Sequence, residues 1–330
     1  MNALDIIGLG DNPKLSILQF DNEDGWLELR KKGIGGSDAG AILGLNKYSS
    51  PLSVYKAKVD GIVKDMSDNA NVKRGKELED FIMTKYVQPK MKEYGYTAEK
   101  PEFMIINSDY PYLRANLDGI AKSMTKPSYE TSILIEIKCV STFAEDAWDG
   151  SEYCGIPPYY YAQMQHYMAV TGMRAGYLVA LFDRTWTVKW YPVKRDDAFI
   201  GKMLKTLKDF YDVNMCMQIP PKIVYSMDKE DAVKAIQNAV QPTVDSPEMT
   251  NLVSEYKDIG KSIKGLEKRK DELASEILSL HRQGFKPTVG KVSFNISTTH
   301  RFDSARFKTE HPDMYEEYCE DVESPRFTVK

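Results

Sequence analysis

The stretch ILIEIKCV, residues 133–140, carries two charged side chains that could do chemistry inside an otherwise apolar strand. Such a short, nearly continuous apolar run is typical of a strand covered on both faces. Because side chains alternate along a strand, Glu136 and Lys138 share a face with Leu134 and Val140. Charged side chains are rarely buried unless they are paired or bound to something. The pair is therefore either a neutralised Glu–Lys contact at the strand end or part of a site.

A second carboxylate, Asp118 in YLRANLDGIA, stands at the expected end of the preceding strand. If the two strands are neighbours, Asp118 and Glu136 meet at one end of a sheet. With the carbonyl of Ile137 they would offer three oxygen ligands, which suits Mg²⁺. Lys138 would then orient a water beside the metal, and the metal would offset charge developing on a phosphate. The alternative for Asp118 is a simple turn-forming role.

Two helical segments could complete this cage. In GKELE, Glu79 could approach the metal, although an exposed helix position is the alternative and fits Glu77 better. In the helix expected at 158–171, Gln163 and Tyr167 share a face at i, i+4. Gln163 could hydrogen-bond the attacking water or a phosphate, and a polar surface position is its alternative.

The glycine-rich stretch GIGGSD leads into a helix for which Ser37 is a plausible N-cap. Gly35, Gly36 and Ser37 at a helix start can present backbone N–H groups to an anion. Arg30 offers a guanidinium fork suited to phosphate. The alternative is an ordinary turn leading into a helix, and the residues alone leave the two interpretations open.

The elements that must position these residues follow from hydrophobic periodicity and turn signals. We expect helices at 22–32, from Ser37, from Ser50-Pro51, and at 71–94, 158–171 and 196–214, and strands at about 100–107, 112–121, 132–140, 175–182 and 185–192. This order predicts an α/β (α+β) fold with a central mixed sheet flanked by helices.

The C-terminal third has a different pattern, and the break IPP at 219–221 suggests domains at 1–220 and 221–330. A heptad stripe of apolar residues, interrupted by Lys270, runs through Met249, Leu252, Tyr256, Ile259, Ile263, Leu266, Leu273, Ile277 and Leu280. It predicts either a coiled coil or partner-binding arm, or a helix, whole or broken near Gly260 or Gly265, that packs on its own domain. A strand at 291–297 and a helical segment broken near Pro312 would follow, so the extension is helical with some β-structure.

Composition excludes few classes of protein. The 330 residues are 42% hydrophobic and 28% charged, as in ordinary globular proteins. No apolar run could cross a bilayer and no signal peptide is recognisable, so we expect no membrane association and a cytoplasmic location. The four cysteines are far apart and form no CxxC pair, which argues against zinc ribbons and iron–sulfur clusters. A net charge of −4 neither indicates nor excludes binding of nucleic acid.

Taken together, the motifs resemble the PD-(D/E)xK nuclease superfamily, and within it the lambda-type phage exonucleases, also called YqaJ-like viral recombinases. The resemblance covers about residues 24–192. It is carried by five segments in the family's order, WLELRKKGIGGSD, GKELE, RANLDG, LIEIKC and AQMQHYMAVTG. The chain departs from the family in having Asn116-Leu117 before Asp118, a variable position, and in its long C-terminal extension.

The resemblance implies a restriction-endonuclease-like core and a Mg²⁺-dependent 5′→3′ double-strand DNA exonuclease, with Mn²⁺ able to substitute. Such an enzyme resects duplex ends from a 5′-phosphate and leaves 3′ single strands for an annealing protein, in a phage or prophage context and as a ring trimer. The catalytic set carried over is Asp118, Glu136, Lys138, Glu79 and Gln163; the 5′-phosphate set is Arg30 and Ser37; the metal set is Asp118, Glu136 and Ile137.

Two other functions remain open from the sequence. One is a different nuclease of the superfamily, restriction- or CRISPR-associated, although the scattered cysteines count against an iron–sulfur version. The other is a catalytically silent DNA-binding protein. The presence of Asp118, Glu136 and Lys138 argues against that second alternative.

Overall fold

A computed structural model of the protein describes residues 3–62, 69–224, 226–237, 245–288, 290, 292–293, 296, 298–319 and 328–329. The chain divides into two units, Met1–Asp228 and Lys229–Lys330. Every side chain expected to do chemistry lies in the first unit. The domain boundary expected after residue 220 stays a prediction.

The first unit contains two β-sheets. Its strands are β1 (Leu15–Gln19), β2 (Ile34–Gly35), β3 (Tyr96–Glu99), β4 (Phe103–Asn107), β5 (Tyr110–Ala115), β6 (Gly119–Ser123), β7 (Ile133–Val140), β8 (Ala175–Phe182) and β9 (Thr187–Lys194). One sheet has the order β3-β6-β7-β8-β9 and the other β1-β4-β5-β2. Both sheets are mixed, because the β7–β8 and β2–β5 pairs are parallel and the other pairs are antiparallel.

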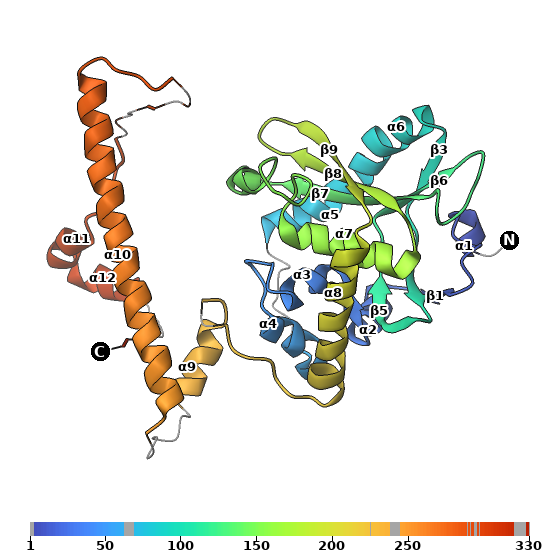
Figure 1. Ribbon diagram of the computed structural model, residues 1–330, viewed down its shortest axis with the longest axis horizontal. Helices are drawn as coiled ribbons and strands as arrows, with labels where there is room; N and C mark the ends of the chain where they lie inside the picture. The colour runs from blue at the N-terminus through green and yellow to red at the C-terminus, as the bar shows by residue number, and fades with distance from the viewer. Residues whose placement is uncertain are drawn as a thin grey trace. The chain divides into compact units, whose positions relative to one another are not determined.

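Helices surround these sheets (Figure 1). They are α1 (Ala3–Ile6), α2 (Glu23–Lys31), α3 (Gly36–Ile42), α4 (Pro51–Tyr55), α5 (Ala70–Ile82), α6 (Gln88–Glu93), α7 (Pro158–Thr171) and α8 (Asp197–Asp209). A π-helical segment, Met83–Val87, joins α5 to α6, so the helix expected at 71–94 is continuous but locally widened. Similar segments extend α4 and α8, to Asp60 and Cys216.

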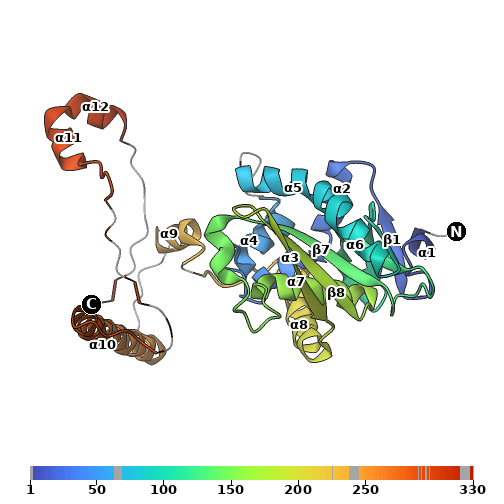
Figure 2. The ribbon, with the colours of Figure 1, turned by 90° about the horizontal axis from the view of Figure 1, so that it is seen from above.

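The five-stranded sheet is covered on both faces, as the apolar sequence of β7 predicts. Ile135 and Ile137 pack with α5 and α6 on one face. Leu134 packs with Met164 and Met168 of α7 on the other. Figure 2 shows α5 and α6 on one side of the strands and α7 on the other. The strand alternation therefore points Glu136 and Lys138 toward α7. Residues Tyr161–Thr171 of α7 are all buried, because this helix also contacts α3, α8 and the second sheet.

The expected α/β class, with mixed sheet and flanking helices, is confirmed, but several local predictions are wrong. Residues 112–121 are not one strand: β5 and β6 belong to different sheets, and Asp118 lies in the link just before β6. A glycine, Gly35, caps α3 in place of Ser37, because the carboxylate of Asp38 accepts the N–H of Gly35 at 2.8 Å and starts the helix earlier. The strands β1, β2 and β3 were not anticipated.

The second unit is helical where the structure describes it. Its elements are α9 (Lys229–Gln237), α10 (Pro247–Arg282), α11 (Ser304–Glu310) and α12 (Pro312–Glu317). Of the alternatives for this region, one long helix is confirmed and the hairpin broken near Gly260 or Gly265 is wrong, because α10 runs unbroken through both glycines. The break at Pro312 is confirmed. The strand expected at 291–297 lies mostly outside the described residues, and the described positions 292, 293 and 296 are not in a strand.

Among the described residues, none of the helices has the length and apolar content needed to span a membrane.

A buried histidine ties α7 to the glycine-rich turn. His166 is fully buried, and its Nε2–H donates to the carbonyl of Ile34 at 3.1 Å. Burial disfavours the charged imidazolium and lowers the pKa of His166 to about 4. In the unfolded chain His166 therefore binds a proton near pH 6.5, whereas in the folded chain it binds one only near pH 4.

We predict that the first unit loses stability as the pH falls through this window, by about 1.4 kcal/mol per pH unit from His166 alone. The measurement is denaturant unfolding followed by tryptophan fluorescence, since all four tryptophans lie in the first unit. His166→Gln, which keeps a donor for the Ile34 carbonyl, should flatten the acid slope. The exposed His300→Gln is the matched control and should leave it unchanged. Parallel slopes for wild type and His166→Gln would contradict the assignment.

Candidate active site

One cavity of about 240 Å³ collects side chains from both sheets and four helices. It contains all seven side chains that the sequence singled out. These are Arg30, Ser37, Glu79, Asp118, Glu136, Lys138 and Gln163. Trp26, Arg114, Asn116 and Tyr167 also line it, and none of these four was in the expected set. Their roles remain predictions, but the structure brings the residues together.

Glu136 is the most buried charged group of the cavity, with 1% of its surface exposed. Its Oε1 accepts hydrogen bonds from Lys138 Nζ and, at 2.6 Å, from Gln163 Nε2. Its Oε2 is buried and has no hydrogen-bond partner in the described structure. Burial, and then the negative charge of Asp118, raise the pKa of Glu136 to about 8. One carboxylate oxygen is thus held in place, and the other has no hydrogen-bond donor in the described structure.

Lys138 balances this carboxylate only in part. Burial acts to lower the pKa of Lys138, but Glu136 and Asp118 outweigh it and hold the pKa above its usual range. The Nζ lies 3.9 Å from Asp118 Oδ2 and 5.3 Å from the ring centroid of Tyr160. The ammonium is therefore a fixed cation at the edge of the cavity and cannot serve as a base near neutral pH.

Asp118 reaches the cavity from the link before β6. The pairing between β6 and β7 ends at Gly119 and Ile135. Beyond that point the backbone of Ile137, on the side of β7 that faces β6, has the side chain of Asp118 as its neighbour. The N–H of Ile137 donates to Asp118 Oδ2 at 2.9 Å. Because the N–H and C=O of one strand residue point to the same side, the Ile137 carbonyl is also directed toward Asp118.

Glu79 lies on α5 and contacts a lysine that the sequence analysis did not consider. Lys100 Nζ is 2.6 Å from Glu79 Oε1 and 3.4 Å from Asp80 Oδ1. Burial and the nearby Asp118 raise the pKa of Glu79. Its neighbour Glu77 is exposed, as expected. The acidic wall of the cavity therefore includes Glu79 and excludes Glu77.

The donor set fits a hard divalent cation. It consists of carboxylate oxygens and a backbone carbonyl, which Mg²⁺ and Ca²⁺ prefer, without the histidine or cysteine that zinc usually takes. The unpartnered Oε2 of Glu136 is an oxygen ready for such an ion. In the part of the chain that the structure describes, no three acidic, histidine or cysteine side chains converge closely enough to form a site by themselves. Water and substrate oxygens would have to complete the coordination.

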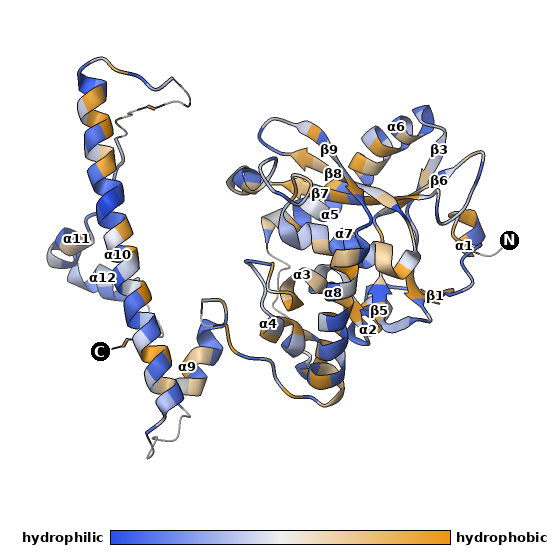
Figure 3. Ribbon diagram, in the orientation of Figure 1, coloured by the Kyte–Doolittle hydropathy of each residue, from blue (hydrophilic) through white to orange (hydrophobic). Residues whose placement is uncertain are grey.

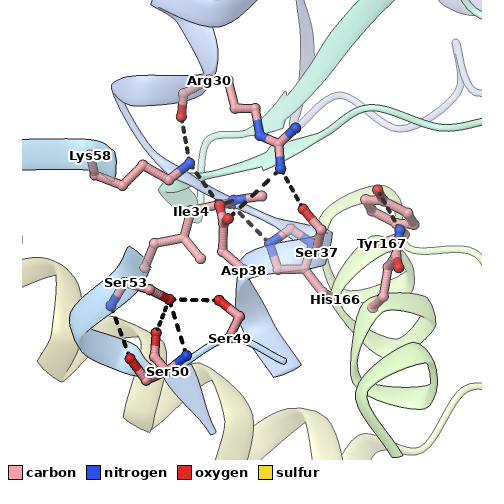
Figure 4. Close-up of polar contacts among 12 residues, drawn as sticks. Arg30, Ile34, Ser37, Asp38, Ser49, Ser50, Ser53, Lys58, His166 and Tyr167 are labelled. Atoms are coloured by element: carbon pink, nitrogen blue, oxygen red, sulfur yellow. Dashed lines mark hydrogen bonds and ion pairs between the residues drawn. The ribbon is translucent and has the colours of Figure 1, made fainter. Parts of the chain in front are cut away.

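The cavity also includes a pocket at the turn between α2 and α3, where Arg30 and Ser37 meet (Figure 4). Arg30 Nη2 donates to Ser37 Oγ at 2.6 Å, and the guanidinium lies 5.0 Å from the ring centroid of Trp26. Gly36 is required here, since a Cβ at that position would lie 2.5 Å from the ring of Tyr167. The turn can therefore pack directly on α7.

A buried ion pair behind this pocket fixes its shape. Lys58 Nζ contacts Asp38 Oδ2 at 2.7 Å and donates to the carbonyl of Arg30 at 2.8 Å. Asp38 also lies 3.9 Å from Arg30. Burial acts to raise the pKa of Asp38, but Lys58 and Arg30 outweigh it and keep the pKa below its usual value. Sequence reasoning missed this pair, and the only signal was an acidic residue in the first turn of a helix.

Arg114 is another cation that the sequence did not reveal. Its Nη1 donates to the carbonyls of Pro111 and Leu113, at 2.6 and 2.9 Å, while its buried Nε has no partner in the described structure. It lines the same cavity as Arg30, so two guanidinium groups contribute positive potential there.

Comparison with known proteins gives the following similarities. Residues 25–174 match the family model of the YqaJ-like viral recombinase domain. A curated relative, "Uncharacterized protein YqaJ" of Bacillus subtilis (strain 168), is 26% identical over 319 residues, which cover 94% of each chain.

Two solved structures are also similar. An alkaline exonuclease (LHK-Exo) from Laribacter hongkongensis is 22% identical with a TM-score of 0.45, and the match covers 66% of this chain and 100% of that one. A phage-related exonuclease from Haemophilus somnus 129PT is 13% identical with a TM-score of 0.42, over 59% of this chain and 100% of that one.

We predict that Glu79→Gln weakens binding of Mn²⁺ to the purified protein by about tenfold or more, as loss of a supporting carboxylate does elsewhere. Glu77→Gln, two residues away and exposed, is the matched control and should bind Mn²⁺ as the wild type does. Calorimetric titration with Mn²⁺ in the absence of DNA makes the comparison. Equal affinities for the two variants would remove Glu79 from the metal site.

Proposed function

Because residues 25–174 carry a YqaJ-like viral recombinase domain, as the sequence led us to expect, we propose that this protein is a metal-dependent DNA exonuclease that digests linear duplexes from a 5′-phosphate end. It would leave 3′ single strands for an annealing protein. The observation that carries the proposal is the buried, half-satisfied carboxylate of Glu136 in one cavity with the Arg30–Ser37 anion pocket.

Asp118, Glu136 and the carbonyl of Ile137 are the groups that would hold Mg²⁺, with Mn²⁺ as a substitute. When bound, the ion would supply charge neutralisation at the scissile phosphate and lower the pKa of water there. The unpaired Oε2 of Glu136 and the pKa of about 8 at this carboxyl group support a cation requirement, because a nearby positive charge favours the ionised form.

The protein's own groups would orient the reactants. Gln163 donates to Oε1 of Glu136 and, through the same Nε2, lies 3.2 Å from the hydroxyl of Tyr167, so the carboxylate has a defined direction. Lys138 remains protonated and would stabilise negative charge that develops on the phosphate oxygens. Glu79 would support the acidic wall from α5.

End recognition would belong to the anion pocket. A terminal 5′-phosphate carries more charge than an internal phosphodiester, and Arg30 with Ser37 offers charge-assisted hydrogen bonds for it. Since both ends of the site share one cavity, a phosphate bound at Arg30 would bring the next phosphodiester toward Glu136 and Lys138. This supports exonuclease over endonuclease action. The annealing partner and the ring trimer remain proposals that rest on the family resemblance.

We predict that Asp118→Asn, Glu136→Gln and Lys138→Ala each reduce the digestion of 5′-phosphorylated linear duplex by about 10²–10⁴-fold. DNA binding at low salt should persist, because three side chains would supply only a few of the contacts to a duplex backbone, and it should weaken steeply as salt rises. Glu77→Gln should digest DNA at the wild-type rate. Wild-type digestion by any of the three cavity variants, with Mg²⁺ present, would reject the assignment of that residue.

A separate prediction concerns the end. Arg30→Ala should reduce the preference for 5′-phosphate over 5′-hydroxyl ends by about 10–100-fold, the value of a charged hydrogen bond. The adjacent Lys31→Ala removes an exposed cation bonded to Glu28 and should keep the preference. Matched duplexes that differ only at the 5′ end provide the test. If both substrates slow equally, Arg30 does not read the phosphate, and cleavage of closed circular DNA would indicate an endonuclease.

A further inference from the structure

The second unit contains a seam of exposed apolar side chains along α10, a helix of 36 residues. Figure 3 shows hydrophobic positions recurring along this helix between polar ones. The nine large apolar residues of the stripe are each 42% to 71% exposed. Scattered apolar residues on a surface are ordinary, but a continuous row of this length marks a contact site.

The spacing identifies the kind of surface that can cover the row. With Lys270 counted as one of its positions, the stripe keeps steps of three and four over more than four heptads. Relative to a straight α-helix such a stripe drifts by about 20° per heptad, so it winds roughly 80–90° around α10. A helix packed on a globular surface instead shows a wider stripe with a 3.6-residue period. Only another long helix, supercoiled with α10, follows the seam from end to end.

The described part of this chain offers no such helix to its own α10. The next longest helical run is Ala70–Glu93, made of α5, the π-helical segment and α6, and its apolar face already packs on the five-stranded sheet. Helix α7, with 14 residues, is buried inside the first unit. Neither is long enough to cover a seam that runs from Met249 to Leu280. The partner helix must therefore come from another molecule.

We propose that α10 pairs with α10 of a second copy of this chain, as a parallel two-stranded coiled coil. The residue types at the seam favour this state over others. The a positions are Met249, Tyr256, Ile263, Lys270 and Ile277. The d positions are Leu252, Ile259, Leu266, Leu273 and Leu280. Two of the five a positions are Ile and four of the five d positions are Leu, a combination that favours parallel dimers. One lysine at an a position specifies register and oligomeric state at a cost in stability.

The flanking charges agree with the parallel arrangement. In register, each g residue faces the e residue five positions later in the partner, and no such pair has like charges; Glu276 faces His281. In a fully overlapped antiparallel pair, Glu255 would face Glu276 at both ends, which is repulsive. Arg269, at another g position, instead pairs with Glu272 of its own helix at 3.1 Å.

This pairing goes beyond the proposed nuclease activity and does not depend on it. It would tether two nuclease units through their C-terminal extensions, and it is a contact separate from the ring trimer that the family resemblance implies for the nuclease unit. A helix of a different protein with a matching seam, and a surface of the chain's own first unit, are the competing occupants, and they are separated by the experiment below.

The test is disulfide cross-linking of the full chain at a d position. Leu266→Cys is introduced in a background where the exposed Cys154, Cys216 and Cys319 are serine. In a parallel in-register pair the two introduced sulfurs lie within disulfide reach, so mild oxidation should give a covalent dimer in high yield. Lys264→Cys, on the outer face of the same turn, is the matched control and should give at least tenfold less.

A seam-breaking variant guards against chance collisions. Adding Ile263→Asp to Leu266→Cys should abolish the cross-link, while tryptophan fluorescence reports an intact first unit. Lys270→Ile, which removes the buried charge, should lower the dissociation constant measured by sedimentation. Absence of a cross-link at position 266, or a cross-link indifferent to Ile263→Asp, overturns the proposal. A purified chain that sediments as a monomer at micromolar concentration also overturns the proposal. The seam would then be covered by one of the competing occupants.

Discussion

The half-satisfied carboxylate of Glu136 is the interaction on which the arrangement of the first unit depends. A carboxylate with 1% exposure is costly to bury, and here one oxygen is bonded to Lys138 and Gln163 while the other has no partner in the described structure. An apolar residue of similar size would suit the middle of a covered strand better. The unfavourable burial of this carboxylate occurs at the position where the proposed chemistry needs an ionised oxygen facing a cation.

Helix α7 makes that position possible. It is buried along most of its length, yet it carries Gln163, His166 and Tyr167, and each of these has a distinct task. Gln163 holds the carboxylate, His166 anchors the turn at Ile34, and Tyr167 packs against Gly36. The parts of the cavity around Glu136 and around the α2–α3 turn are thus positioned by a single element. A shift of α7 would disturb both parts together.

Electrostatics divides the cavity in the same way. Negative groups gather around Asp118, Glu136 and Glu79, and they are only partly balanced by Lys138 and Lys100. Guanidinium groups of Arg30 and Arg114 line the same cavity. Such a gradient suits a substrate that is anionic throughout and is cut where a cation has been recruited. In the second unit no comparable polar cluster is described, and its exposed seam suits assembly instead of chemistry.

The sequence by itself determined the chemistry-bearing residue types, the order of most helices and strands, and the two faces of β7, because these depend on local periodicity. The resemblance of five ordered segments brought the five expected catalytic residues together with Arg30 and Ser37, and these seven do share one cavity. Sequence pattern could not show that residues 112–121 are divided between two sheets, because the hydrophobic pattern of a strand is the same in either sheet. Nor could it show the ion pairs of Lys58 with Asp38 and of Lys100 with Glu79, because these partners are 20 to 21 residues apart and follow no helix or strand period. The hydrogen bonds of Arg114 to nearby backbone carbonyls leave no pattern in the sequence either. Those choices belong to tertiary structure, since burial and ion pairing depend on which distant side chains meet.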